Sequence, residues 1–458
     1  MSSSASALGQ NIHPDTIVAI STPPGRGGIG IVRLSGSSTV AIAEPMLRLR
    51  RPLAAGQARF AEILDDSGAV LDEAVVTFFA APNSYTAEDV VEIAAHGSPV
   101  VLEMLVRRAI AAGACLAEPG EFTQRAFLSG RLDLTQAEAV RDLIEASTLG
   151  QARVAARQLG GALSRQIAPV KSHLVALVAA LEAGVDFAED DIDTMSADEI
   201  IQRLAVIEAP LRELERSFDY GRIVHDGLRL AIVGRPNAGK SSLFNRLVER
   251  DRAIVTATPG TTRDLVTERV AIHGIPIELI DTAGLREATD EVETIGIAKS
   301  REAMADADLV LLVIDASAPL HEEDAATLAS LEGRPALVAA NKVDLGAAIA
   351  LGHAPTTVQT SAITGQGIDE LRKAIIGVVG AGGAEQETAL VTNLRQRQAI
   401  SATLAAIERA TTAAAEEIPH EMLLLDLYEA LSALDSLTGA TTTDDILRLI
   451  FSTFCIGK

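Results

Sequence analysis

Residues 234–241 combine glycines, a lysine and a serine at a spacing that suits the binding of phosphate groups. Their sequence, GRPNAGKS, fits the pattern G-x-x-x-x-G-K-S and lies between an apolar stretch at 228–233 and a helical pattern at 243–247. In that context backbone N–H groups wrap phosphates, the lysine reaches the outer phosphates, and the serine hydroxyl binds Mg²⁺. We therefore expect Lys240 to act in catalysis. The expected contacts with a nucleoside triphosphate here are Asn237, Ala238, Gly239, Lys240, Ser241 and Ser242.

Three more short motifs follow strand-like stretches farther along the chain. In DTAG, Asp281 can hold Mg²⁺ through water and the N–H of Gly284 can sense the γ-phosphate. In NKVD, Asp344 can accept both N–H donors on the base-pairing edge of guanine, a donor pair that adenine lacks. The order and spacing of these motifs indicate a GTPase. The expected contacts are Asp281, Thr282, Ala283, Gly284, Asn341, Lys342 and Asp344, with Ser361 and Ala362 resembling a loop that contacts the guanine oxygen.

The residue after Gly284 is Leu285, where small Ras-like GTPases carry the glutamine that orients the attacking water. Another group must therefore orient that water. The nearby carboxylates are Glu287, Asp290, Glu291 and Glu293. From the residues alone, a catalytic carboxylate and a solvated acidic segment both remain open.

The predicted secondary structure around these motifs differs from one part of the chain to the next. Up to about residue 130, short β-like stretches alternate with Gly/Pro turns and a helical patch at 100–112, which predicts a small α+β domain. A helical run follows to about residue 218, and Thr135 with Glu138 has the spacing of a capping box. Helical periodicity returns near the other end, where Gly439 is placed to end a helix.

Between these helical regions, strand and helix patterns alternate and predict a doubly wound, mostly parallel sheet. The candidate strands are 228–233, 275–280, 309–314, 335–340 and 357–360. We infer that this domain is inserted into one helical domain built from both flanks, while two separate helical modules remain the alternative. The expected domains are 1–130 (α+β), 131–224 (helical, first part), 225–381 (GTPase) and 382–458 (helical, second part).

Composition restricts the partners and the compartment. The chain has 458 residues, with 39 Lys+Arg against 62 Asp+Glu and a net charge of −23. A broad basic face for nucleic acid is therefore not expected, because phosphate binding depends on Lys and Arg displacing counterions. The two cysteines, Cys115 and Cys455, are too few for a disulfide framework and could both be buried thiols. With no run of 18 apolar residues and no secretory signal at the start, we expect a cytoplasmic protein without membrane association.

Five segments together resemble the MnmE (TrmE) family of tRNA modification GTPases. They are TPPGRGGIGIVRLSG, GRPNAGKSS, TPGTTRD, DTAGLRE and FCIGK, and the resemblance extends over essentially the whole chain. It implies an N-terminal α+β folate-binding-like domain that forms a homodimer, a discontinuous helical domain and an inserted Ras-like P-loop GTPase domain. It also implies a heterotetramer with the FAD-containing flavoprotein MnmG (GidA). That complex would add a carboxymethylaminomethyl-type group at C5 of the wobble uridine of certain tRNAs, with a carbon from formyl- or methylene-tetrahydrofolate.

The resemblance also assigns roles to residues of the GTPase domain. It implies a K⁺ ion that replaces an arginine finger, with Asn237 as a ligand and Thr256, Thr258 and Thr261 lining the K⁺ loop. Thr262 joins Ser241 as a Mg²⁺ ligand, and Glu293 would orient the attacking water through a second water. Thr256, Thr261 and Thr262 are accordingly expected near GTP as well.

For the N-terminal domain, the resemblance implies a folate site made of Arg33, Glu92, Arg131 and Lys458. It also makes Cys455, in a helix expected to begin near Thr443, a candidate nucleophile or proton donor, although a buried inert thiol remains open. Gly25, Gly27 and Gly30 fit G-x-G-x-x-G, but the alternating residues that follow predict a hairpin turn and not a dinucleotide site.

Two other functions remain as alternatives. One is a regulatory GTPase that acts in ribosome assembly without modification chemistry. The other is a one-carbon enzyme in which the GTPase domain only regulates.

Overall fold

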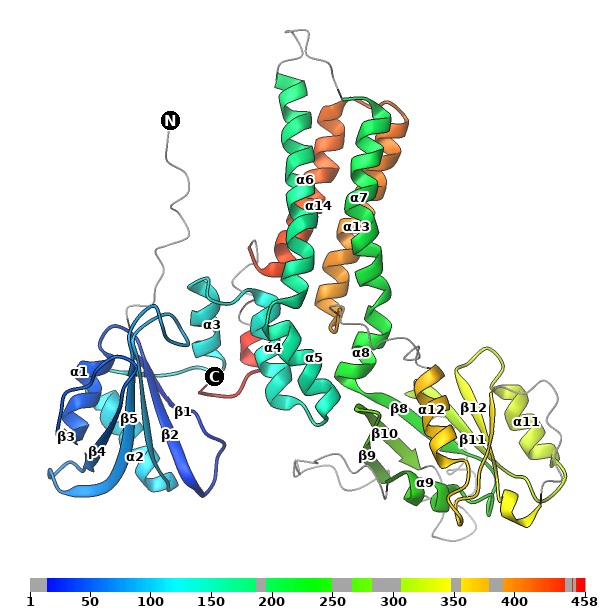
Figure 1. Ribbon diagram of the computed structural model, residues 1–458, viewed down its shortest axis with the longest axis horizontal. Helices are drawn as coiled ribbons and strands as arrows, with labels where there is room; N and C mark the ends of the chain where they lie inside the picture. The colour runs from blue at the N-terminus through cyan, green and yellow to red at the C-terminus, as the bar shows by residue number, and fades with distance from the viewer. Residues whose placement is uncertain are drawn as a thin grey trace, which may run out of the picture. The chain divides into compact units, whose positions relative to one another are not determined.

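The computed structural model describes residues 15–186, 195–248, 266–281, 306–346, 356–378, 390–440, 447 and 450–457 (Figure 1). The chain divides into two compact units. The first combines residues 1–141 with 435–458, and the second comprises 142–434.

A seven-stranded sheet forms the first unit, in the order β3-β4-β5-β6-β2-β1-β7. Neighbouring strands are antiparallel except β1 and β7. The strands are β1 (Ile17–Ile20), β2 (Gly27–Ser35), β3 (Leu47–Leu49), β4 (Ala58–Leu64), β5 (Val70–Phe79), β6 (Val90–Gly97) and β7 (Cys115–Leu116). The helical elements are α1 (Thr39–Ala43), η1 (Glu44–Met46), α2 (Pro99–Ala111), α3 (Glu121–Leu128) and the start of α4 (Leu134–Glu145).

Alternation along these strands separates the apolar face that packs against α2 from a face that carries polar side chains beside the small apolar cluster of Ile17, Ala19 and Phe122. Leu102 and Leu105 of α2 are buried against Val32 of β2 and Ile93 of β6. Burial of each large aliphatic side chain contributes about 1.5–3 kcal/mol. Since successive side chains of a strand point to opposite faces, Arg33 and Glu92 lie on the other face of the sheet. The α+β prediction is confirmed, although β3, β4, β6 and β7 were not predicted.

The glycines near the start of the chain are distributed differently from the prediction. Strands β1 and β2 form an antiparallel hairpin, and Gly25 (φ 121°) lies in its connection. Gly27 and Gly30, however, lie within β2 and not in the turn. A side chain at position 30 would meet Leu102 at 2.4 Å, so close packing of α2 explains that glycine.

The second unit contains a six-stranded sheet in the order β13-β12-β11-β8-β10-β9. The strands are β8 (Leu228–Val233), β9 (Val266–Ile272), β10 (Ile275–Asp281), β11 (Leu309–Asp315), β12 (Ala336–Asn341) and β13 (Thr357–Gln359). The associated helical elements are α9 (Lys240–Val248), α11 (Glu322–Ser330), η2 (Val343–Leu345) and α12 (Ile368–Val378). Helices α9 and α12 contribute to the larger apolar core, whereas the smaller core includes Leu331, which directly follows α11.

All neighbouring strands of this sheet are parallel except β9, which is antiparallel to β10. The mostly parallel, doubly wound prediction is therefore confirmed, and the predicted strand starts agree within one residue. Strand β9, at the edge of the sheet, was not predicted, because its charged residues Glu268 and Arg269 are adjacent and interrupt the strand-like pattern.

The helical part of this unit is built from both sides of the sheet in sequence. Its helices are α5 (Leu149–Leu159), α6 (Ala162–Asp186), α7 (Ala197–Arg216), α8 (Phe218–Asp226), α13 (Leu394–Ala415) and most of α14 (His420–Thr438). Helix α13 packs against α7, where Ser401 donates a hydrogen bond to Glu215 (2.7 Å), and Figure 1 shows α6, α7, α13 and α14 running side by side. Among the described helices, Ala162–Val185 has a length and composition that could cross a membrane, a test that core helices also pass.

The start of α4 corrects one local prediction. Asp133, and not Thr135, precedes the helix, and its carboxylate accepts a hydrogen bond from the backbone N–H of Gln136 (2.9 Å). The Gln136 side chain accepts in return from the backbone N–H of Asp133 (3.0 Å). The predicted capping box of Thr135 and Glu138 is therefore wrong, because Asp133 and Gln136 form the same reciprocal pair two residues earlier. At the end of α14, Gly439 (φ 89°) follows the last helical residue, as predicted.

Candidate functional site

The loop between β8 and α9 has the backbone conformation that a phosphate loop needs. Gly234 (φ 143°) lies so close to β11 that a side chain would meet the carbonyl oxygen of Val313 at 2.2 Å. Asn237 and Gly239 also have positive φ angles of 63° and 96°. These turns bend residues 234–239 around the start of α9, whose N-terminus favours anions.

Lys240 is the first residue of α9 and is buried. Its ammonium group donates hydrogen bonds to the carbonyl oxygens of Gly234 and Arg235, both at 2.8 Å. The positive charge therefore lies inside the curve of the loop, where it can meet phosphate oxygens. Ser241 and Ser242 follow in the exposed first turn of the helix.

Asn341 connects the phosphate loop to the loop expected to bind the base. The side chain is 1% exposed; its amide nitrogen donates to the carbonyl oxygen of Ala238 (3.0 Å) and its amide oxygen accepts from the N–H of Ala362 (3.0 Å). A methyl group on Gly239 would lie 2.2 Å from this amide nitrogen. The arrangement fixes two loops that are more than a hundred residues apart in sequence.

Lys342 and Asp344 complete the NKVD motif beside Asn341. Lys342 (φ 68°) forms an ion pair with Asp315 at the end of β11, with 2.6 Å between the ammonium nitrogen and a carboxylate oxygen. Partial burial raises the pKa of Asp315, but hydrogen bonds from Lys342 and Ser317 outweigh it and lower that pKa overall. Asp344 lies in η2 and is exposed, so its carboxylate is accessible to a base. Asp315 was missed, although its place after a buried strand parallels that of Asp281.

Two of the residues expected at Mg²⁺, Ser241 and Asp281, follow or end parallel strands of the sheet. Asp281 ends β10, which runs parallel to β8, and Ser241 stands in the helix that follows the phosphate loop. A carboxylate and a hydroxyl oxygen suit a hard cation such as Mg²⁺. The amide oxygen of Asn237, on an exposed side chain, likewise suits K⁺. The remaining expected residues of this site, Thr256, Thr258, Thr261, Thr262, Thr282, Ala283, Gly284 and Glu293, lie outside the described residues.

A second polar site lies in the first unit, on the polar face of its sheet. Arg33 of β2 and Glu92 of β6 are directly opposite in the strand register and form an ion pair with a 2.7 Å separation. The rings of Tyr85 and Phe122 lie 5.5 and 5.6 Å from the Arg33 guanidinium carbon. The structure thus brings two of the four predicted folate residues together, with aromatic rings beside them.

The segment 455–457 also contacts the site around Arg33 and Glu92. The carbonyl oxygen of Gly457 accepts hydrogen bonds from Arg33 (3.4 Å) and from the hydroxyl of Ser21 (3.1 Å). A side chain at Gly457 (φ 94°) would meet the Ile20 carbonyl oxygen at 2.4 Å. Lys458, the fourth predicted folate residue, lies outside the described residues.

Cys455 differs from the prediction in two ways. It lies after the helical residues 450–452, not in a helix, and its thiol is exposed, as is that of Cys115. The interpretation of both cysteines as buried thiols is therefore wrong. For Cys455, the reason is that the chain leaves the helix after Ser452, turns, and forms a bridge from Ile456 to Pro119.

Tyr85 is a residue of this site that the sequence analysis missed. Its hydroxyl lies 2.9 Å from that of Thr123 in α3, and burial raises its pKa against the opposing effects of Thr123, Arg33 and Arg131. Arg131, itself exposed, is therefore close enough to influence this ring. A lone tyrosine in a loop has no sequence signal that would have singled it out.

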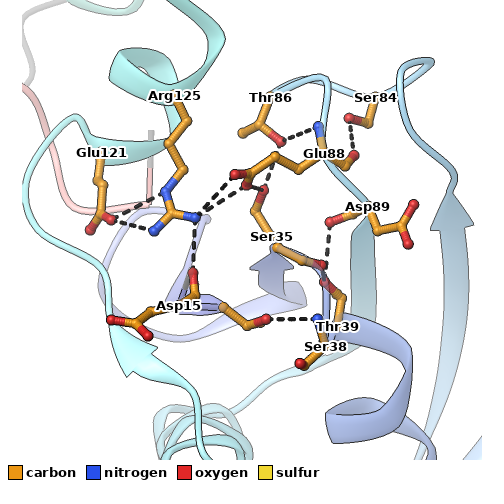
Figure 2. A network of polar contacts seen from close by, with 12 residues as sticks. Asp15, Ser35, Ser38, Thr39, Ser84, Thr86, Glu88, Asp89, Glu121 and Arg125 are labelled. Carbon is orange, nitrogen blue, oxygen red and sulfur yellow. Dashed lines mark hydrogen bonds and ion pairs between the residues drawn. The ribbon is translucent and has the colours of Figure 1, made fainter. Parts of the chain in front are cut away.

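A buried polar network fixes the loop that carries Tyr85 (Figure 2). Arg125 of α3, 5% exposed, forms ion pairs with Glu121 (2.8 Å) and with Glu88 (3.2 Å). Glu88 also accepts a hydrogen bond from the hydroxyl of Ser35 (2.7 Å), next to the hydroxyl of Thr86. Because a buried charge is tolerated only when it is paired, this network ties β2, α3 and residues 84–89 to one another.

The sheet topology, the wrapped lysine and the Asn341 bridge define a P-loop GTPase. Two family models match the chain: "GTP-binding protein TrmE N-terminus" over residues 16–131 and "MnmE helical domain" over residues 134–455. The chain belongs to the MnmE family of tRNA modification GTPases.

Curated members of this family are similar in sequence to the chain over nearly its full length. The chain is 59% identical to the tRNA modification GTPase MnmE of Koribacter versatilis, over 97% of this chain and 99% of the relative. It is 44% identical to that of Aquifex aeolicus, over 97% and 100%. Among solved structures, the G domain of the T. maritima FeoB iron transporter is 30% identical, covers 33% of this chain and 98% of its own, and has a TM-score of 0.24.

Proposed function

We propose that the protein hydrolyses GTP to GDP and phosphate as part of tRNA modification. The bridge from Ala238 through Asn341 to Ala362 supports this most directly, because it couples a phosphate loop to a base loop. Lys240 would bind the outer phosphates. Ser241, Thr262 and Asp281 would hold Mg²⁺, directly or through water, and the ion would offset the charge on the phosphates. Asp344 would select guanine by accepting its two N–H donors.

For the hydrolysis step we propose activation by K⁺. Asn237 is one ligand, and Thr256, Thr258 and Thr261 line the remainder of that site. Glu293 orients the attacking water through a second water. The support is the absence of a glutamine after Gly284 and the exposed Asn237 side chain in the phosphate loop.

For the first unit we propose a site for formyl- or methylene-tetrahydrofolate. Arg33, Arg131 and Lys458 carry positive charges that suit the folate carboxylates, and Glu92 can accept from the amino edge of the pterin. The short distance between Arg33 and Glu92 and their location beside Tyr85 and Phe122 support it. Cys455, which is exposed and lies two residues before Gly457, is the proposed nucleophile or proton donor.

The proposed assembly is a homodimer through the N-terminal domain, joined by the FAD-containing MnmG (GidA) in a heterotetramer. Phe60 and Val75 form an exposed cross-strand pair on β4 and β5, with 52% and 47% of their surfaces accessible. Such a pair suits burial against a second copy. With a net charge of −23, this chain would bind tRNA mainly together with its partner. The proposed setting is the cytoplasm.

The complete proposal is that this complex adds a carboxymethylaminomethyl-type group at C5 of the wobble uridine. It is tested by nucleoside analysis of tRNA from cells lacking this protein and from cells in which it is restored. Loss of the modified wobble uridine that only the intact gene restores is the expected result. An unchanged nucleoside profile together with accumulated ribosome precursors would favour the alternative, a regulatory GTPase of ribosome assembly.

A further inference from the structure

Arg246 in α9 binds the loop that follows β13. Its Nε atom donates to the carbonyl oxygen of Ala362 (3.1 Å), and one terminal guanidinium nitrogen donates to the carbonyl oxygen of Ile363 (2.7 Å). A guanidinium group presents donors in a rigid planar fork, so two bonds to successive carbonyls fix both the position and the direction of that backbone.

Among the described residues, the inner part of this loop is held by burial of Ser361 and Ala362 and by a hydrogen bond from the Ser361 N–H to Gln366 (2.9 Å), whereas Ile363 lies farther out. Within the loop, the N–H groups of Thr364 and Gly365 donate to the side chain and carbonyl of Ser361 (3.2 and 2.8 Å). The side chain of Ile363 is 74% exposed, so packing contributes little there. Arg246 therefore supplies the attachment between the outer part of this loop and a regular helix.

These contacts form a closed ring that joins the phosphate loop, the loop after β13 and α9. Asn341 bonds Ala238 on one side and Ala362 on the other. Arg246 then links Ala362 to α9, and α9 begins at Lys240, only two residues after Ala238. The phosphate loop, the base loop and α9 thus constrain one another. Arg246 supplies the contact between the base loop and α9.

We propose that Arg246 is a positioning residue that holds residues 361–363 where they meet the carbonyl oxygen of guanine. This rests on the proposed use of GTP. Without Arg246, Asn341 still holds the inner end of the loop, but the backbone at Ile363 is no longer fixed. The loss should therefore fall on recognition of the base oxygen and not on the phosphates.

The test measures equilibrium binding of two nucleotides to the full chain and to Arg246→Met. One nucleotide is GTP, and the other is 6-thioguanosine triphosphate, which keeps both N–H donors of guanine and replaces its carbonyl oxygen with sulfur, a weaker hydrogen-bond acceptor. We expect Arg246→Met to weaken GTP binding about tenfold and analogue binding less than about twofold. Turnover at saturating GTP should be unchanged. Arg246→Lys, which retains the charge but not the fork, should lie between the two proteins.

Arg269→Met is the matched control, because Arg269 is an exposed arginine on β9 at the opposite edge of the same sheet. It should leave both affinities unchanged. Equal weakening of GTP and analogue in Arg246→Met, or no weakening of either, would overturn the positioning role. If the unaltered protein itself bound GTP no more tightly than the analogue, it would not recognise the base oxygen at all. That result would contradict the proposed recognition of guanine, whatever the role of Arg246.

Discussion

The Nε2 atom of His225, at the end of α8, lies 3.1 Å from a carboxylate oxygen of Asp142 in α4. The Nδ1 atom lies 2.7 Å from Asp226. The hydrogen bond with Asp142 is the largest effect that raises the pKa of His225 from 6.5 to about 9, against an opposing contribution from burial. The imidazolium thus connects α4 with the C-terminal end of α8, directly before β8 begins.

This pair predicts a pH dependence of stability. Because the pKa of His225 is higher in the folded protein than in the unfolded chain, its stabilisation is complete below about pH 6.5 and is lost as pH rises toward 9. Urea unfolding of the second unit should therefore show a decrease of about 2 kcal/mol over that interval. His225→Gln should remove most of the decrease. His173→Gln, at an exposed position of α6, is the control and should retain the decrease. If His225→Gln showed a decrease as large as that of the unaltered protein, other groups would cause the pH dependence.

Gly239 should not tolerate a side chain. Its φ of 96° and the 2.2 Å approach to Asn341 mean that Gly239→Ala must displace the amide that joins the two loops. We expect GTP binding, measured by calorimetry, to weaken more than about a hundredfold, or about 2.7 kcal/mol. Gly377→Ala in α12 meets nothing within 4 Å and should leave binding unchanged while stabilising the helix by up to about 1 kcal/mol. Equal binding by both variants would contradict this account of the site.

Arg33 should be required for folate binding but not for GTP hydrolysis. Arg33→Met should weaken binding of formyl-tetrahydrofolate at least about tenfold, because a charged hydrogen bond is worth about 1.5–3 kcal/mol. Fluorescence titration can measure this, with GTPase activity as the internal reference. Arg48→Met, which breaks the exposed ion pair with Glu62 in the same sheet, is the control and should bind folate normally. Normal binding by Arg33→Met would move the folate site elsewhere.

Hydrolysis should depend on the monovalent cation and on Glu293. Replacing K⁺ by Na⁺ should slow steady-state phosphate release at least about tenfold, since a cation that offsets transition-state charge is worth several kcal/mol. Glu293→Ala should bind GTP normally and lose most turnover in either salt. If turnover in K⁺ survived this substitution, another group would orient the water. Equal rates in K⁺ and Na⁺ would remove the K⁺ site from the mechanism.

The GTPase motifs could be predicted from sequence because each is a local pattern with a fixed relation to a strand end. Asn341 and Lys240 are examples, since the strand that precedes each fixes its place at one edge of the sheet. Arg246 and Tyr85 could not be found in this way. Each is an ordinary residue in a helix or a loop, and its role depends on a backbone that arrives from a distant part of the chain. Strand β9 was missed because Glu268 and Arg269 are consecutive and break the alternation that predicts a strand.

The bond between Arg33 and Gly457 joins positions separated by 424 residues. During synthesis, therefore, the sheet that carries Arg33 leaves the ribosome long before its last partner exists. At roughly 5–20 residues per second, the interval is roughly 20 to 80 seconds. The second unit can fold in the meantime, since its residues 142–434 are all made earlier than Gly457. A newly made chain can thus fold its GTPase part before the proposed folate site is complete, which sets an order of maturation within a single polypeptide.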